Sequence, residues 1–342
     1  INNYIVMVVI SAEAGVNHNG SLETALEMVD VAKKSGADAI KFQTFKSELL
    51  TSPKAEKANY QKETTGINES QLEMIQKLEL TYEDFRKVYN KCEEVGIKFI
   101  STPFDLDSVD FLNSLPVDIF KIGSGDLTNW MLLKKVLKTG KKIILSTGMS
   151  NMNEVNDTIN FLHDNNFYNY VILHCVSCYP TKHDDLNLKS ITTLKNEYPK
   201  NDIGFSDHTL GNKASIYSVC LGAIYIEKHF TLDKKMEGPD HRASLNPEEL
   251  YNFVSEIKEC EIMLGNGEKR CRPNEIEVRD KVRRSLFVNK DLKSGYKIKE
   301  EDLIALRPYD GICSSTYKEY IGKELTKDMD KHDYIEDLLE YR

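Results

Sequence analysis

Short apolar runs recur along most of the chain, and segments with helical periodicity separate them. In the first such segment, Leu22, Ala25, Leu26, Val29 and Ala32 share one face of a predicted helix. The apolar runs cover residues 8–11, 39–42, 98–101, 119–122, 142–146, 171–175, 203–205 and 223–227. Eight strand–helix units over roughly 260 residues predict a (β/α)8 barrel, the TIM-barrel form of the α/β class.

Polar side chains stand at or just past the end of every predicted strand. In a (β/α)8 barrel the active site lies at the carboxyl ends of the strands, so these positions are the candidate site. They are Glu13, Asn17, His18, Asn19, Lys41, Gln43, Thr102, Phe104, Asp105, Lys121, Ser124, Ser146, Thr147, Ser177, Tyr179, Ser206, Asp207, His208, Glu227 and His229. Their side chains can bind a metal ion, a phosphate group or hydroxyl groups.

Two histidines follow neighbouring predicted strands about one strand–helix unit apart. His208 closes the run at 203–205 and His229 closes the run at 223–227. Adjacent parallel strands would bring both imidazoles side by side, where they could share a divalent metal and leave positions open for substrate. The alternative is two unrelated polar residues at strand ends, but the polar ends of the other strands favour the metal.

Two lysines lie inside otherwise apolar strand ends, where an unpaired charge is costly. An anionic ligand would relieve that cost for Lys41 and Lys121. The small hydroxyl loops at 123–125 and 146–148 offer Ser124, Ser146 and backbone N–H groups to phosphate or carboxylate oxygens. Two alternatives stay open: each lysine pairs with a barrel carboxylate, or Lys121 forms a Schiff base with a carbonyl substrate.

Composition narrows the classes of function. A net charge of −9 and a pI near 5.5 argue against a broad nucleic-acid-binding surface. The apolar run at 6–10 is too short to span a bilayer, so no membrane partner is expected. Seven scattered cysteines fit reduced thiols and a cytoplasmic location. Cys175 and Cys178 lack a second Cys-x-x-Cys pair, which favours a buried strand-end thiol over zinc. Neither Gly-rich loop matches a nucleotide-binding motif.

The barrel pattern stops near Leu264. Residues 265–281 are charged and marked by Gly and Pro, so they predict a linker. The remaining chain holds two short strand-like pieces, 285–288 and 303–306, with Gly turns between polar segments. We therefore expect a catalytic barrel at 1–264, a linker at 265–281 and a small second domain at 282–342.

Seven motifs lie in order along the barrel part of the chain, at residues 12–20, 36–44, 101–105, 120–125, 145–149, 204–210 and 238–245. Together they resemble the motifs of the sialic acid synthases, a family that condenses phosphoenolpyruvate with an N-acetylated hexosamine to a nine-carbon 2-keto sugar acid. Through residues 283–287 and 306–308, the tail is similar to the antifreeze-like (SAF) domain that ends these synthases.

The resemblance implies a role for each matching residue. His208 and His229 would ligate a divalent ion, typically manganese with magnesium or cobalt as alternatives, and Glu13 would bind metal-associated water or orient the reacting groups. Family members form domain-swapped homodimers, so Arg307 would reach the N-acetyl group in the partner's barrel. Phosphoenolpyruvate would be held by Lys41, Lys121, Ser124, Ser146 and Ser206, and the sugar by Asn59, Phe104, Tyr179 and Asp240. No organic cofactor is expected.

Two positions depart from the family pattern. Ser177 stands where the family commonly has Asn, which affects a contact to phosphoenolpyruvate or sugar. Asp126 stands where Glu is common, which shortens a candidate proton-transfer side chain by one methylene.

The activity that we expect joins phosphoenolpyruvate, N-acetylmannosamine and water into N-acetylneuraminate and phosphate. An alternative in the same family is a legionaminic acid or related nonulosonic acid synthase that uses a diacetamido hexose. Other classes are a Schiff-base sugar aldolase and a non-catalytic carbohydrate-binding protein. A binding protein would not need the polar strand ends of a complete barrel.

Overall fold

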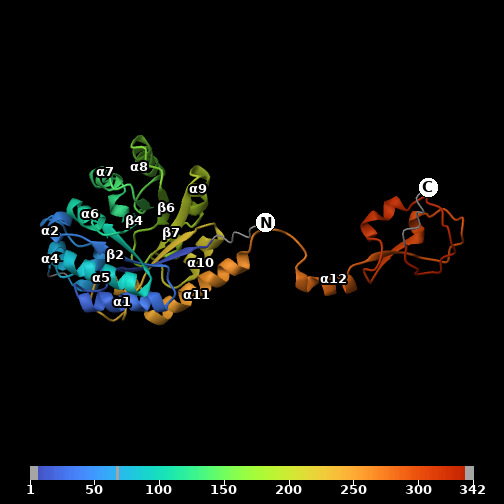
Figure 1. The fold of residues 1–342 in the computed structure, drawn as a ribbon, viewed down its shortest axis with the longest axis horizontal. Coiled ribbons are helices and arrows are strands. Elements are labelled where there is room, and N and C mark those ends of the chain that lie inside the picture. Colours follow the sequence, from blue (N-terminus) through green and yellow to red (C-terminus); the bar gives the residue numbers. More distant parts are fainter. Residues whose placement is uncertain (1–6, 67–68, 336–342) are drawn as a thin grey trace. The chain divides into compact units, whose positions relative to one another are not determined.

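The computed structural model describes residues 7–66 and 69–335. The chain divides into two compact units, residues 1–266 and 267–342, and each is described by itself (Figure 1). Residue 6 of the expected first apolar run and residues 336–342 of the expected second domain lie outside the described residues.

The first unit is a closed barrel of eight parallel strands in sequence order, which confirms the predicted fold. Every predicted apolar run lies in or overlaps one of these strands, because strands covered on both faces are apolar along their length. The strands are β1 (Val9–Gly15), β2 (Ala39–Thr44), β3 (Lys98–Pro103), β4 (Ile119–Ile122), β5 (Lys142–Ser146), β6 (Tyr170–Cys175), β7 (Asp202–Asp207) and β8 (Tyr225–His229).

Helices follow each strand and lie around the barrel (Figure 1). Local sequence signals set their ends: the Ser21 hydroxyl accepts from the Thr24 N–H at the first helix, and Gly96 ends another in the left-handed region at φ 70°. The helices are α1 (Leu22–Lys34), α5 (Tyr82–Val95), α6 (Leu106–Asn113), α7 (Trp130–Leu137), α8 (Met152–Asp164), α9 (Lys189–Glu197), α10 (Lys213–Cys220) and α11 (Pro247–Leu264).

The connection after β2 is much longer than the others. It contains α2 (Ser47–Leu50), α3 (Asn59–Thr65) and α4 (Gln71–Gln76) before α5 begins. We refer to residues 51–80 as the β2 insert. The insert supplies part of the candidate site described below.

The barrel interior has an apolar floor and a polar top. Ala39, Ile100, Ile144, Val171 and Tyr225 belong to a small buried cluster formed by strand residues at the amino-terminal side of the barrel. A much larger core fills the space between strands and helices. The charged side chains of the interior lie toward the carboxyl ends of the strands, whereas the floor holds only uncharged polar groups such as Ser11 Oγ and the Tyr225 hydroxyl among the described residues.

The second unit is small and has its own core. β9 (Ser285–Val288) and β10 (Leu303–Leu306) pair antiparallel, with the bounds that the sequence predicts. Leu286, Val288, Leu325 and Met329 are among the residues that bury against one another there. The segment expected to be a linker contains a short helix, α12 (Ile276–Val282). Within the described residues, none of the helices combines the length and apolarity that crossing a bilayer requires.

Candidate active site

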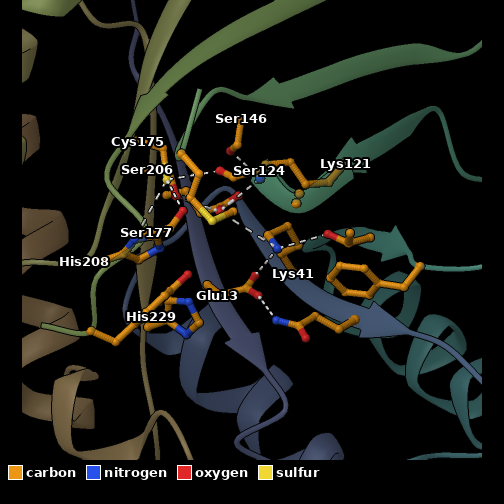
Figure 2. Close-up of a pocket in the computed structure, with 18 of the residues that line it drawn as sticks. Glu13, Lys41, Lys121, Ser124, Ser146, Cys175, Ser177, Ser206, His208 and His229 are labelled. Atoms are coloured by element: carbon orange, nitrogen blue, oxygen red, sulfur yellow. Dashed lines mark hydrogen bonds and ion pairs between the residues drawn. The ribbon is translucent and has the colours of Figure 1, made fainter. Parts of the chain in front are cut away.

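A pocket of about 370 Å³ opens at the carboxyl ends of the strands. It brings together fourteen of the residues that the sequence singles out, from all eight strands or the loops that follow them (Figure 2). These are Glu13, Lys41, Gln43, Thr102, Phe104, Lys121, Ser124, Ser146, Ser177, Tyr179, Ser206, His208, Glu227 and His229. The volume falls in the range of small-molecule sites.

Strand register sets which of these side chains meet. Glu13 of β1 is paired with Lys41 of β2 on one side and with His229 of β8 on the other. Ser206 of β7 is paired with Glu227 of β8. Because side chains alternate along a strand, these residues share the interior side while their sequence neighbours face the helices.

Two lysines and two glutamates form a buried charge cluster at the base of the pocket. Lys41 Nζ lies 2.7 Å from Glu13 Oε2 and donates to Thr102 Oγ1 at 3.3 Å (Figure 2). Lys121 Nζ donates to Ser146 Oγ at 2.7 Å and lies 3.4 Å from Glu227 Oε1. The same Glu227 oxygen is 3.9 Å from Lys41 Nζ. Both lysines therefore have a barrel carboxylate as partner, the first alternative left open by the sequence.

Burial shifts the titration of this cluster unequally. Desolvation raises the pKa of Glu13 to about 7, although Lys41 opposes the shift. Burial alone would lower the pKa of Lys41, but Glu13 and Glu227 together outweigh it, and the pKa rises. For Lys121, burial outweighs the attraction of Glu227, and the pKa falls. When Glu13 is protonated, two ammonium groups face one carboxylate, so the cluster carries one excess positive charge that suits an anion.

Small residues next to the cluster leave space for oxygen atoms of a ligand. The Gly148 N–H donates to Ser124 Oγ at 3.0 Å. A Cβ added to Gly148 would lie 2.4 Å from Ser177 Oγ and 2.7 Å from Ser124 Oγ. A larger residue at this position would displace both serine side chains, whereas glycine leaves their hydroxyls available as donors or acceptors.

The two histidine rings lie next to each other in the pocket wall, with centroids 5.5 Å apart (Figure 2). His208 Nδ1 lies 2.8 Å from the Val176 carbonyl oxygen, a contact that assigns the proton to Nδ1 and leaves Nε2 as a free lone pair. His229 Nδ1 is buried and has no hydrogen-bond partner. Desolvation, together with His208 and Lys41, lowers the pKa of His229 well below its usual range, so this ring is neutral.

The unpartnered Nδ1 of His229 and the lone pair on His208 Nε2 fit a divalent metal ion. Desolvation by burial opposes a charge on His208, but Cys175 and the Val176 carbonyl outweigh it and raise the pKa of this ring, so a metal ion would have to displace a proton more readily held than on His229. Among residues 7–66 and 69–335, no three His, Cys, Asp or Glu side chains gather into a ready-made ligand set. If His208 and His229 hold a metal ion, two imidazole ligands leave positions open for water or substrate, as at catalytic metal sites.

Aromatic rings connect the histidines with the β2 insert. The Tyr179 ring lies 4.1 Å from the His208 ring, and the Tyr60 ring stacks on Tyr179 at 5.3 Å. The insert also lines the pocket with Ala58, Gln61 and Gln71. These contributions of the insert were not identified from the sequence, where only the unusual length of the connection gave a signal.

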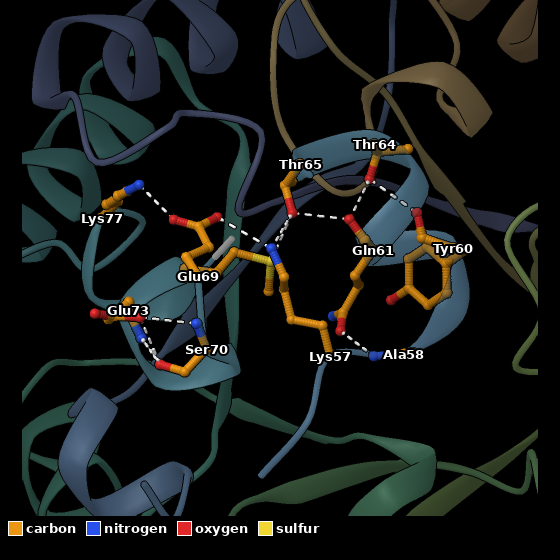
Figure 3. Close-up of polar contacts among 11 residues, drawn as sticks. Lys57, Ala58, Tyr60, Gln61, Thr64, Thr65, Glu69, Ser70, Glu73 and Lys77 are labelled. Atoms are coloured by element: carbon orange, nitrogen blue, oxygen red, sulfur yellow. Dashed lines mark hydrogen bonds and ion pairs between the residues drawn. The ribbon is translucent and has the colours of Figure 1, made fainter. Parts of the chain in front are cut away.

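Polar contacts within the insert fix its shape (Figure 3). The side chain of Lys57 is only 1 % exposed, and its Nζ donates to Thr65 Oγ1 at 3.0 Å and to Glu69 Oε1 at 3.3 Å. The Gln61 amide oxygen accepts from the Ala58 N–H at 2.9 Å. These contacts hold α3 as a short, defined helix beside the pocket.

Ten candidate residues do not line the pocket: the strand-end residues Asn17, His18, Asn19, Asp105, Thr147 and Asp207, and four that the family motifs single out, Asn59, Asp126, Asp240 and Arg307. Asn59 is exposed at the start of α3, and Asp126 is half-buried and accepts from Asn129 Nδ2 at 2.9 Å. Asp240 is buried, which raises its pKa to about 6 against the opposing effect of His208. Arg307 is exposed in the second unit. Conversely, Cys175 lines the pocket, 3.8 Å from His208 Nδ1, although the sequence gave it no role beyond a buried thiol.

Two family models match the chain. Residues 28–269 match the NeuB family, and residues 283–337 match the SAF domain. The first match covers most of the barrel and the second covers the small unit, so the architecture predicted from the sequence is confirmed.

Similar proteins cover nearly the whole chain. The N,N'-diacetyllegionaminic acid synthase of Campylobacter jejuni is 46 % identical over 95 % of this chain and 98 % of its own. The synthase of the same name from Legionella pneumophila is 45 % identical over 94 % of this chain and 91 % of its own. A crystal structure of N-acetylneuraminic acid (sialic acid) synthetase from Leptospira borgpetersenii has 34 % identity, a TM-score of 0.70 and coverage of 81 % and 92 %. These matches confirm the resemblance to the sialic acid synthases, and the chain is an enzyme that belongs to the NeuB family.

Proposed function

We propose that this enzyme condenses phosphoenolpyruvate with a 2,4-diacetamido-2,4,6-trideoxyhexose of the manno type and releases phosphate, yielding N,N'-diacetyllegionaminic acid. Two relatives that bear this activity in their names are 46 % and 45 % identical along nearly the full chain, whereas the Leptospira sialic acid synthetase is 34 % identical. That difference carries the proposal. It replaces the expected sugar, N-acetylmannosamine, with the alternative substrate of the same family.

Phosphoenolpyruvate occupies the charge cluster in this proposal. Lys41 and Lys121 neutralise its phosphate and carboxylate, and the hydroxyls of Ser124, Ser146 and Ser206 bind the remaining oxygens. Protonated Glu13 leaves the cluster one excess positive charge, as derived above from the two lysines and two glutamates. Holding the anion rigidly positions its enol carbon for attack and lowers the entropic part of the barrier.

A divalent metal, with manganese as first choice and magnesium or cobalt as alternatives, would be held by His208 and His229. When bound, such an ion supplies Lewis-acid polarisation to a carbonyl oxygen. The partnerless His229 Nδ1 and the oriented His208 ring support this assignment. No organic cofactor takes part in the proposed reaction.

The chemistry follows from the two substrates. C3 of phosphoenolpyruvate forms a bond to the aldehyde carbon of the sugar, and positive charge develops at C2. The buried carboxylate of Glu227, beside the two lysines, stabilises that positive charge. Water then adds at C2, and phosphate leaves as the C2–O bond breaks. Glu13 has a pKa of about 7, so both of its protonation states are accessible. The protonated carboxyl can donate its proton to the sugar oxygen, and the resulting carboxylate can accept a proton from the water.

The sugar lies toward the outer part of the pocket in this proposal. Phe104 and Tyr179 line this part of the pocket and contact the sugar. Asp240 is buried and does not line the pocket, so its carboxyl affects sugar binding only through the residues that do. Asn59 and Asp126 stand outside the lining and contribute only after a local rearrangement. Arg307 acts from the partner chain of a domain-swapped homodimer, and the enzyme works in the cytoplasm.

Phosphate release from phosphoenolpyruvate tests the proposal. Three sugars are compared with manganese present: the 2,4-diacetamido-2,4,6-trideoxymannose, N-acetylmannosamine and N-acetylmannosamine 6-phosphate. We expect a kcat/KM at least tenfold higher with the diacetamido sugar. A preference for N-acetylmannosamine would restore the first expectation, and no release with any sugar would contradict the synthase activity.

A further inference from the structure

Behind the two histidines, on the helix-facing side of the strands, lies a buried ion pair. Lys228 Nζ is 3.0 Å from Asp207 Oδ2, and the two side chains are 1 % and 0 % exposed. Helix-facing positions of barrel strands are normally apolar, as Phe205 and Ile226 are two residues earlier on the same two strands. Replacing a buried ion pair with apolar residues is often neutral or stabilising, so stability alone gives no reason for this pair.

The pair stands on the last rung that joins β7 to β8. Asp207 and Lys228 are register partners, and His208 and His229 are the next residues along their chains. Because side chains alternate, the pair faces the helices while both imidazoles face the pocket. The ion pair therefore ties the two strands together immediately before the histidines.

Asp207 also fixes the backbone on the far side of His208. Its Oδ1 accepts from the Thr209 N–H and from Thr209 Oγ1, both at 2.8 Å. Lys228 Nζ donates to the Thr209 carbonyl oxygen. On α10, Ser215 Oγ donates to Asp207 Oδ2 at 2.6 Å. The residues before and after His208 are thus both immobilised, and β8 is linked to the same network through Lys228.

We infer that Asp207 and Lys228 are positioning residues that hold the imidazoles of His208 and His229 at the separation a divalent metal requires. Neither residue touches the pocket. The network acts through the backbone of the residues adjacent to the two ligands, as outer-shell groups do at metal sites. The inference rests on the proposed metal role of the two histidines.

Mn²⁺ binding without substrates tests the inference, because it separates positioning from turnover. The loss of the free Mn²⁺ electron paramagnetic resonance signal gives a Kd for the full chain. In the double variant Asp207→Asn/Lys228→Met, the charges disappear while shape and the acceptor for Thr209 remain. We expect a Kd about 10- to 100-fold higher, a Tm within a few degrees of wild type and an unchanged Kd for phosphoenolpyruvate.

Matched controls distinguish position from charge loss in general. Asp202→Asn/Lys142→Met removes an ion pair of the same types at the opposite end of β7, 3.7 Å apart and partly exposed, and should leave the Mn²⁺ Kd unchanged. Ser215→Ala replaces the double variant if that variant fails to fold, because it leaves no buried charge without a partner; we expect it to raise the Mn²⁺ Kd about three- to tenfold. Ser218→Ala is its control: it removes a hydrogen bond within the same helix, to the Ser215 carbonyl at 2.6 Å, and should leave the Mn²⁺ Kd unchanged.

The outcomes separate the two claims. A double variant, or a Ser215→Ala variant, that binds Mn²⁺ within twofold of wild type overturns the positioning role and leaves the metal site intact. Equal losses of Mn²⁺ and phosphoenolpyruvate affinity overturn it as well, because they indicate general damage. Wild-type protein that binds no Mn²⁺ overturns the metal role itself, and the inference with it.

Discussion

Replacing Lys121 with Met tests whether the charge of this lysine contributes to binding of phosphoenolpyruvate. Met keeps most of the volume and removes the charge. In the structure, Lys121 Nζ donates to Ser146 Oγ at 2.7 Å and lies 3.4 Å from Glu227 Oε1, whereas Lys41 lies 2.7 Å from Glu13 and 3.9 Å from the same Glu227 oxygen. Whether Glu13 is ionised or protonated, Lys121 shares Glu227 with Lys41 and has no carboxylate of its own, so its charge has attraction left for a ligand.

The expected magnitude follows from the contacts. A hydrogen bond to a charged group contributes about 1.5–3 kcal/mol, and 1.4 kcal/mol is about tenfold in affinity. Lys121→Met should therefore raise the Kd of phosphoenolpyruvate roughly 10- to 150-fold. The fold should survive, because Glu227 keeps Ser206 Oγ at 3.0 Å and Lys41 at 3.9 Å. We expect a loss of about 1–3 kcal/mol in the free energy of unfolding.

Isothermal titration with phosphoenolpyruvate in the absence of sugar measures the change directly. Lys98→Met is the control, since Lys98 pairs with the exposed Asp118 at the amino end of β3 and should not affect binding. A Kd for Lys121→Met within threefold of wild type would refute the anion site. Borohydride treatment with pyruvate checks the remaining alternative: trapping of a covalent adduct on Lys121 would indicate the Schiff-base aldolase.

Three further predictions concern protons, metal and packing. Because Glu13 has a pKa of about 7, it ionises as the pH rises from 6 to 8 and adds negative charge beside the anion; phosphoenolpyruvate affinity should fall over that range in wild type and much less in Glu13→Gln, measured by titration at each pH. Chelation should abolish turnover, and added Mn²⁺ should restore it in wild type but not in His229→Ala, whose Tm should stay near the wild-type value by calorimetry. A Cβ at Gly204 would lie 2.4 Å from the Tyr225 carbonyl oxygen and 2.5 Å from Leu173 Cδ2, so Gly204→Ala should cost roughly 1–3 kcal/mol or more in chemical denaturation; an unchanged midpoint would contradict the packing.

The strands could be predicted because their physical signal is local. Buried parallel strands are continuous apolar runs, and β4, β5, β9 and β10 have the bounds expected from the sequence. Strand ends then selected most of the pocket, since the carboxyl ends of a barrel converge whatever the details of register. The SAF domain came from the resemblance of its motifs and not from periodicity.

The partners within the site could not be predicted, because they depend on register and on loop conformation. Glu13 meets Lys41 only through the pairing of β1 with β2, which spacing along the chain does not specify. Tyr60 and Gln61 lie on a two-turn helix whose pocket-facing side has no apolar pattern to reveal it. Cys175 alternates into the pocket at the end of β6, a consequence of strand phase that the Cys-x-x-Cys spacing obscured.

The most direct test of the central claim is the reaction in ¹⁸O-water with phosphoenolpyruvate, manganese and the diacetamido sugar, followed by mass spectrometry of both products. The account predicts a nine-carbon sugar acid with the mass of phosphoenolpyruvate, the sugar and water together, less that of phosphoric acid. The released phosphate should carry no ¹⁸O, because water adds at C2 and the C2–O bond breaks. Phosphate that contains one ¹⁸O, or phosphate without a sugar acid, would show hydrolysis at phosphorus and contradict the proposed synthase.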